Sequence, residues 1–142
     1  MSKDWCRDYA TAAFRLWKMN GQLTRSEIED RIRTGYIRNN PGDPQVVNIK
    51  AQAEVDKRFA ELNDIDACAE TFRLLRESGK DYVCKAVEDV YMYDAQRDLH
   101  RGEITRRVIR VAVTLPASER EIYRWLAEAR TLFSALRGLR IE

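Results

Sequence analysis

The sequence predicts an all-α protein, in which an N-terminal helical bundle with a long central helix is followed by two C-terminal helices joined by a tight turn. Apolar residues recur at steps of three and four along most of the chain, which is the period of one helix face. The clearest breaker, the Asn-Asn-Pro-Gly-Asp-Pro segment at 39–44, interrupts this pattern. No two segments offer strands that could pair with each other, so a sheet is not expected.

Two helices are expected before this breaker. Apolar spacing predicts the first over residues 4–19, where Asn20-Gly21 provides a C-terminal stop. A shorter helix is expected over residues 26–34, with Ser26 or Thr24 as its N-cap and Gly35 directly after its end.

The segment 45–77 contains neither glycine nor proline, and it predicts one long helix with Asn63-Asp64 as the candidate position of a kink. Its apolar stripe consists of Val55, Phe59, Leu62, Ile65, Cys68, Phe72 and Leu75. Such a stripe fits either a dimerising coiled coil or packing within the chain. The small number of strict heptads favours packing within the chain.

Further along, residues 82–91 show helical spacing, and a polar loop is expected over 94–102. The next segment, 103–115, fits two structures. Its β-branched residues alternate as in a strand, through Ile109, Val111, Val113 and Leu115. A helix fits the same segment through Ile104, Val108, Val111, Ala112 and Leu115. We predict a helix, because a lone strand cannot satisfy its backbone hydrogen-bonding groups.

The best-marked element is a helix from about Glu119 to Arg137. Ser118 can accept a hydrogen bond from a backbone N–H of the first turn, and Glu121 completes an S-x-x-E capping box. Gly138 supplies the left-handed residue of a C-cap. One apolar stripe is expected to pack on the core, Trp125 included: Ile122, Trp125, Leu126, Ala129, Phe133 and Leu136.

Composition limits the class of protein. A chain of 142 residues with 44% hydrophobic content can bury one core, as one domain or two small ones. We expect an N-terminal interaction or oligomerisation region over residues 1–79 and a C-terminal domain over 80–142. Charged residues make up 34%. No apolar run of membrane-spanning length and no export signal is evident, so we expect no membrane partner and a cytoplasmic location.

Catalytic chemistry is not expected. The three cysteines are far apart and the only histidine is His100, so no metal site or cofactor is predicted. Neither a Ser-His-Asp set nor a glycine-rich phosphate cradle can be assembled from the residues present. The protein is therefore not expected to be an enzyme.

Positive charge is concentrated at the C-terminal end. Residues 101–142 carry nine arginines, no lysine and five glutamates, for a net charge of +4, whereas residues 1–100 have a net charge of −2. This asymmetry is expected for an element that meets phosphates. The alternative is an ordinary solvated helical surface.

The segment 80–141 resembles the RinA and ArpU group of phage-encoded transcriptional regulators. The resemblance lies in Gly102-Glu103-Ile104, in the run from Leu115 to Leu126, and in the run from Phe133 to Leu139. Residues 117–125 more distantly resemble the turn and recognition helix of the promoter-reading C-terminal domain of bacterial sigma factors. The similarity implies a helix-turn-helix. The Val- and Arg-rich segment 103–115 departs from the acidic first helix of sigma factors, so polymerase contacts are not carried over.

By this resemblance, the start of the last helix faces the major groove of DNA. The expected base-reading residues are Ser118, Glu119, Arg120, Tyr123 and Arg124. Arg120 and Arg124 are the strongest candidates, because arginine donates two hydrogen bonds to guanine O6 and N7. Tyr123 fits either a base contact or a packing role. Candidates for phosphate contacts, which need only charge within reach, are Arg101, Arg106, Arg107, Arg110 and Arg130.

Three functions follow as hypotheses. The first is a sequence-specific activator of phage or prophage late genes that binds double-stranded DNA and offers its N-terminal helices to another copy of itself or to RNA polymerase. The second is a DNA-packaging recognition subunit that acts within a ring. The third is a helical interaction module that does not bind DNA and whose arginine-rich end docks on an acidic protein.

Overall fold

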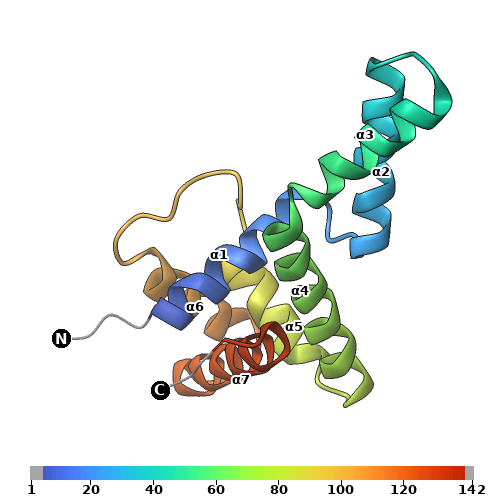
Figure 1. The fold of residues 1–142 in the computed structure, drawn as a ribbon. Helices are drawn as coiled ribbons and strands as arrows, with labels where there is room; N and C mark the ends of the chain where they lie inside the picture. Colours follow the sequence, from blue (N-terminus) through green and yellow to red (C-terminus); the bar gives the residue numbers. More distant parts are fainter. Residues whose placement is uncertain (1–4, 140–142) are drawn as a thin grey trace.

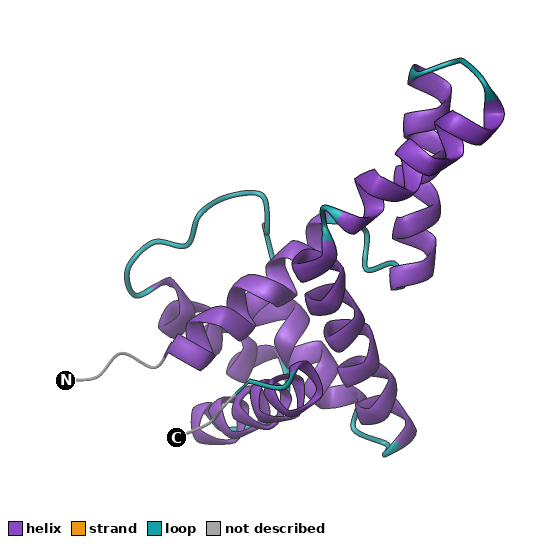
Figure 2. Cartoon of the chain, in the orientation of Figure 1, coloured by secondary structure: helices purple, strands orange, loops and turns teal. Residues whose placement is uncertain are grey.

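A computed structural model describes residues 5–139, in which every regular element is helical (Figures 1 and 2). The elements in chain order are α1 (Trp5–Met19), α2 (Arg25–Asn39), α3 (Pro44–Asp56), α4 (Phe59–Glu77), α5 (Asp81–Val87), the π-helical turn η1 (Glu88–Met92), α6 (Glu103–Thr114) and α7 (Glu119–Arg137). The all-α prediction is confirmed.

One core joins α1, α4, α5, η1, α6 and α7, and it also includes Ile28 of α2 and Val55 of α3. The rest of α2 and α3 extends away from it as a helical hairpin (Figure 1). The aromatic ring of Phe14 in α1 lies 6.0 Å from that of Phe72 in α4 and 5.5 Å from that of Phe133 in α7. All three are essentially fully buried. The core therefore crosses the boundary expected between residues 79 and 80, and the two regions pack directly on each other.

The C-terminal helix has the ends that its sequence predicts. The Ser118 hydroxyl accepts a hydrogen bond from the Glu121 N–H at 3.1 Å, and the Glu121 carboxylate accepts one from the Ser118 N–H at 3.2 Å. Gly138 ends the helix with φ +78°. At the start of α2 an equivalent capping box joins Thr24 and Glu27, which identifies Thr24 as the N-cap.

The expected end of the second helix is wrong. The helix passes through Gly35 and ends at Asn39. One glycine inside a helix costs only about 1 kcal/mol relative to alanine, and the packing of α2 on α3 offsets that cost.

The prediction of one long helix over 45–77 is also wrong. The segment forms two helices, α3 and α4, which are separated at Lys57-Arg58 and not near Asn63-Asp64. Those two polar residues lie inside α4 and make tertiary contacts. The Asn63 side-chain oxygen accepts a hydrogen bond from Arg25 at 2.6 Å, and the Asp64 carboxylate accepts one from Arg137 at 2.7 Å. Their polarity reflects these contacts and not a kink.

The ambiguous segment 103–115 is a helix, as predicted. Val108 and Val111 are buried, as the helical pattern requires. Ile109 and Val113, which fitted only the strand pattern, are 47% and 83% exposed. Among residues 5–139, no helix is both long and apolar enough to span a membrane.

Candidate nucleic-acid interface

The rear of α7 is fixed in the core. Ile122, Leu126, Ala129 and Phe133 are fully buried, and the Trp125 ring packs edge-on against Tyr82 at 4.8 Å. The packing role predicted for the apolar stripe is confirmed for these residues, whereas Leu136 is 41% exposed.

Polar contacts hold α7 near its C-terminal end and near its middle. Near its C-terminal end, Asp64 accepts hydrogen bonds from Arg137 and from the Tyr9 hydroxyl, each at 2.7 Å. Further toward its start, Glu128 pairs with Lys80, which lies directly before α5. Contacts from α1, from α4 and from the segment before α5 thus fix the position of α7, and with it the position of its first turns.

The opposite face of these first turns is open to solvent. Glu119, Arg120, Tyr123 and Arg124 are all exposed, with Tyr123 at 40%. Within residues 5–139, neither Arg120 nor Arg124 makes a hydrogen bond or ion pair. Their guanidinium N–H groups are therefore free to donate hydrogen bonds to an external acceptor. Ser118 is exposed as well, but the capping box occupies its hydroxyl.

Helix α6 leads through the turn 115–118 into α7 and packs against its start. The Tyr123 hydroxyl donates to the Thr105 hydroxyl across the two helices at 3.4 Å. No signal in the sequence marks Thr105, because the rotation of α6 relative to α7 cannot be read from either helix alone. Tyr123 therefore combines an exposed ring with a contact to α6, which fits both of the roles left open for it.

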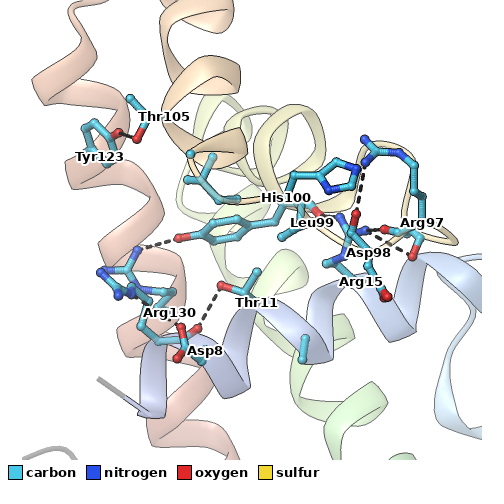
Figure 3. Close-up of a pocket in the computed structure, with 16 residues that line it drawn as sticks. Asp8, Thr11, Arg15, Arg97, Asp98, Leu99, His100, Thr105, Tyr123 and Arg130 are labelled. Atoms are coloured by element: carbon cyan, nitrogen blue, oxygen red, sulfur yellow. Dashed lines mark hydrogen bonds and ion pairs between the residues drawn. The ribbon is translucent and has the colours of Figure 1, made fainter. Parts of the chain in front are cut away.

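A pocket of about 600 Å³ opens beside Tyr123, between α1, the 93–102 loop, α6 and α7 (Figure 3). Two turns along α7, the half-buried Arg130 lines the same pocket and donates a 2.7 Å hydrogen bond to the Tyr91 hydroxyl. Of the proposed phosphate-contact residues, Arg130 is the one that shares a pocket with a proposed base-reading residue.

Arg107 does not fit the role predicted for it. Only 2% of it is exposed, so it cannot reach phosphates outside the protein. Its guanidinium donates to the carbonyl oxygens of Val90 and Tyr93, each at 2.9 Å, and pairs with the carboxylate of Glu103. These carbonyls lie at the C-terminal end of η1, where helical acceptors lack intrahelical partners and cations are favoured.

Arg15 of α1 supports the same chain segment from the other side. It donates to the carbonyl oxygens of Tyr91 at 2.7 Å, Asp94 at 3.2 Å and Ala95 at 3.3 Å, and also to that of Arg97. Burial, followed by the charge of Arg107, lowers the pKa of Arg15. Two buried arginines thus fix the start of the loop that precedes α6.

The other predicted phosphate contacts lie apart from one another. Arg101 lies two residues before α6 and Arg106 lies in its first turn, and both are exposed. Arg110 is exposed too, but it lies over the Tyr93 ring at 5.9 Å from the centroid, on the side of α6 that faces η1. Thr105, which contacts Tyr123, lies on a different side of α6 and lines a different pocket. The structure therefore does not bring Arg110 together with the exposed turns of α7.

Acid is expected to destabilise the fold through Glu103, which is 7% exposed. Its carboxylate accepts hydrogen bonds from Arg97, from the His100 backbone N–H and from Arg107. These contacts, led by Arg97, hold the pKa of Glu103 far below its usual range. A carboxyl whose folded-state pKa is depressed adds stability above its unfolded pKa, about 4.3, and that stability is lost at lower pH.

The measurement is the free energy of unfolding in urea as a function of pH. In the wild type it should fall progressively below about pH 5, and Glu103→Gln should flatten this dependence. Glu77→Gln, which changes a side chain that is 61% exposed, is the control and should keep the wild-type profile. A Glu103→Gln profile parallel to the wild type would contradict the assignment.

Comparisons of the chain with protein-family models, with characterised proteins and with solved structures find no match in any of the three. Among residues 5–139, no group of three or more histidine, cysteine, aspartate or glutamate side chains could hold a metal ion. The candidate interface is therefore defined by its own geometry: a helix with a buried rear, two unoccupied arginines on its exposed leading turns, and a helix packed across its start.

Proposed function

We propose that this protein is a sequence-specific DNA-binding regulator of transcription that acts in the cytoplasm and places the first turns of α7 in the major groove of double-stranded DNA. The observation that supports this most strongly is the contrast between the two faces of α7. Ile122 and Leu126 are fully buried, whereas Arg120 and Arg124, on the same turns, are exposed and make no hydrogen bond or ion pair within residues 5–139. An arginine in that state is ready to bind an external acceptor.

The arrangement suits base reading for a physical reason. Recognition helices present their N-terminal residues to base edges, while the preceding helix crosses the sugar-phosphate backbone. Here Arg120, Tyr123 and Arg124 lie within the first two turns of α7, and Arg106 lies near the start of the preceding helix. We therefore assign base contacts to Arg120 and Arg124 and a phosphate contact to Arg106.

We further propose that this regulator activates phage or prophage late genes, on the basis of the resemblance of residues 80–141 to the RinA and ArpU group. The remaining helices would then contact other proteins, among them RNA polymerase. The α2–α3 hairpin is the element best exposed for such a contact, because it extends away from the core (Figure 1).

Salt-titrated binding to duplex DNA tests the proposal. Each phosphate that a basic side chain neutralises releases counterions, so the logarithm of the affinity should fall linearly with the logarithm of salt concentration. Arg106→Ala should weaken binding to all sequences about equally and reduce the magnitude of the slope by about 1.

Arg38→Ala is the matched control, because it removes the same charge from an exposed position on the α2–α3 hairpin. It should leave both the affinity and the slope unchanged. Absence of duplex binding at low salt, or an affinity that does not depend on salt, would refute the proposed function and favour an interaction module that does not bind DNA.

A further inference from the structure

The pocket beside Tyr123 has the size of a small-molecule site. Its volume of about 600 Å³ lies within the roughly 300 to 1,000 Å³ typical of ligand pockets. Residues from α1, the 93–102 loop, α6 and α7 line it (Figure 3). The loop side is held in place, because Arg15 donates hydrogen bonds to the carbonyl oxygens of Asp94 and Ala95. The walls of the pocket are therefore fixed by the protein's own contacts.

Positive charge predominates in the lining of this pocket. Four arginines and two aspartates line it: Arg7, Arg15, Arg97, Arg130, Asp8 and Asp98. Arg7 and Arg97 each pair with a carboxylate, and the guanidinium of Arg15 is bound to backbone carbonyl oxygens. Arg130 is different, because it makes no ion pair within residues 5–139. It is the arginine of this pocket whose charge lacks a counter-charge among the described residues.

Arg130 and Tyr91 leave hydrogen-bond donors unused beside the pocket. Within residues 5–139 the half-buried Arg130 donates once, from Nη1 to the Tyr91 hydroxyl at 2.7 Å. Tyr91 is only 3% exposed, and its own O–H has no acceptor among the described residues. A guanidinium carries five N–H donors, and a partly buried charge without a partner is costly. Donors of this kind are best satisfied by an oxyanion.

The backbone that carries Tyr91 gives an independent indication of a functional site. Tyr91 lies in the π-helical turn η1, which continues α5. Single π-helical turns are rare overall and occur frequently at functional sites. Here the turn carries a buried tyrosine whose hydroxyl meets the half-buried arginine of the pocket.

The remainder of the pocket offers apolar surface. Leu99 of the loop and Ile104 of α6 line it, and both are half-buried. Arg130 and Leu99 lie on different sides of the pocket (Figure 3). A ligand whose anionic group binds Arg130 can therefore extend an apolar body toward Leu99 and Ile104. Apolar surface combined with a few polar groups is typical of pockets that bind small molecules.

We propose that this pocket binds a small organic carboxylate, whose oxygens accept hydrogen bonds from Arg130 and Tyr91 and whose apolar body packs on the apolar lining. The Nε–H and Nη2–H groups of Arg130 form a planar fork that matches a carboxylate. A monoanion suits the site better than a phosphate dianion, since Arg130 supplies one uncompensated charge and two aspartates also line the pocket. The inference does not rest on the proposed function, because it requires no contact with DNA.

An NMR titration of the full-length, ¹⁵N-labelled protein with 3-phenylpropionate tests the proposal. Saturable amide shifts should appear in the 93–102 loop and around Arg130. The dissociation constant should be about 5 mM or tighter, an ordinary affinity for a ligand of this size. The uncharged 3-phenylpropionamide keeps the apolar body but not the charge, so it should bind at least about tenfold more weakly.

Two variants test the assigned donors. Arg130→Met keeps an apolar side chain but removes the charge, and it should weaken binding of 3-phenylpropionate by about tenfold or more. Tyr91→Phe removes only the hydroxyl and should weaken binding by roughly 2- to 10-fold. Arg38→Ala is the control, because it removes a positive charge from an exposed position on the α2–α3 hairpin, outside the pocket. It should leave the affinity unchanged.

Circular dichroism checks that each variant is folded, and Tyr91→Phe tests the site even if Arg130→Met does not fold. Four results would each overturn the proposal: no saturable shifts, shifts centred outside the pocket, equal affinity for the carboxylate and the amide, or wild-type affinity in the folded donor variants. All of these measurements are made without DNA, so their failure is distinguishable from failure of the proposed function.

Discussion

Replacement of Arg107 by alanine is expected to lower the free energy of unfolding by roughly 3 to 5 kcal/mol, the usual cost of removing one partner of a buried ion pair. The Arg107 side chain is 2% exposed, and its loss removes a donor from the carbonyls of Val90 and Tyr93 and from the carboxylate of Glu103. The Glu103 carboxylate keeps its hydrogen bonds from Arg97 and from the His100 N–H, whereas the two carbonyls lose the guanidinium that binds them. A loss of this size is a large fraction of the roughly 5 to 15 kcal/mol typical of a folded protein. Urea unfolding followed by circular dichroism measures it.

The neighbouring Arg106 provides the control. Arg106 is exposed, so Arg106→Ala should change the unfolding free energy by no more than about 0.5 kcal/mol. If Arg107→Ala proves so unstable that no native baseline remains, Arg107→Met retains the packing of the side chain and should give a smaller, measurable loss. Arg107→Ala with wild-type stability would show that Arg107 does not hold the loop before α6.

Loss of both leading arginines of α7 is expected to abolish sequence preference in DNA binding. A bidentate arginine contact to guanine contributes about 1 to 3 kcal/mol of discrimination, or roughly 5- to 150-fold in relative affinity. Arg120→Ala with Arg124→Ala should therefore bring the affinity for a preferred duplex close to that for a scrambled one. The measurement is the ratio of the two dissociation constants at one fixed salt concentration.

Lysine substitution is the matched control for charge. Arg120→Lys with Arg124→Lys keeps both positive charges but removes the planar fork that makes two parallel hydrogen bonds. This variant should retain the affinity for scrambled DNA while losing most of the preference. A preference that survives in both double variants would place base reading outside the start of α7.

Local signals predicted the C-terminal part of the fold well. The ends of α7 depend on Ser118, Glu121 and Gly138, whose effects act within a few residues, and all three behave as expected. The choice of helix for 103–115 was correct because it used a condition on the whole chain, the absence of a partner strand. The exposure of Arg120 and Arg124 followed from the apolar stripe on the other side of the same helix.

The errors arose where tertiary contacts override local pattern. Helical spacing places Arg107 on the side of Val108 and Val111 and Arg106 on the other side, but the charge of Arg107 predicts an exposed position. The carbonyls at the end of η1 are what allow this guanidinium to be buried. Gly35 was expected to end α2, but packing on α3 extends the helix past it. The helix is interrupted at Lys57-Arg58, where the sequence has neither glycine nor proline and so no helix-breaking residue from which to predict the interruption. In each case, the deciding interaction joins segments that are distant in sequence or lies outside the local pattern.

Selection of bound duplexes from a random pool shows whether the first turns of α7 read DNA sequence. We expect the wild type to enrich one motif containing guanine at the positions read by arginine, and the Arg120→Ala, Arg124→Ala double variant, selected in parallel, to enrich none. Recovery of unenriched sequence by the wild type, or of the same motif by the double variant, would contradict base reading by these turns.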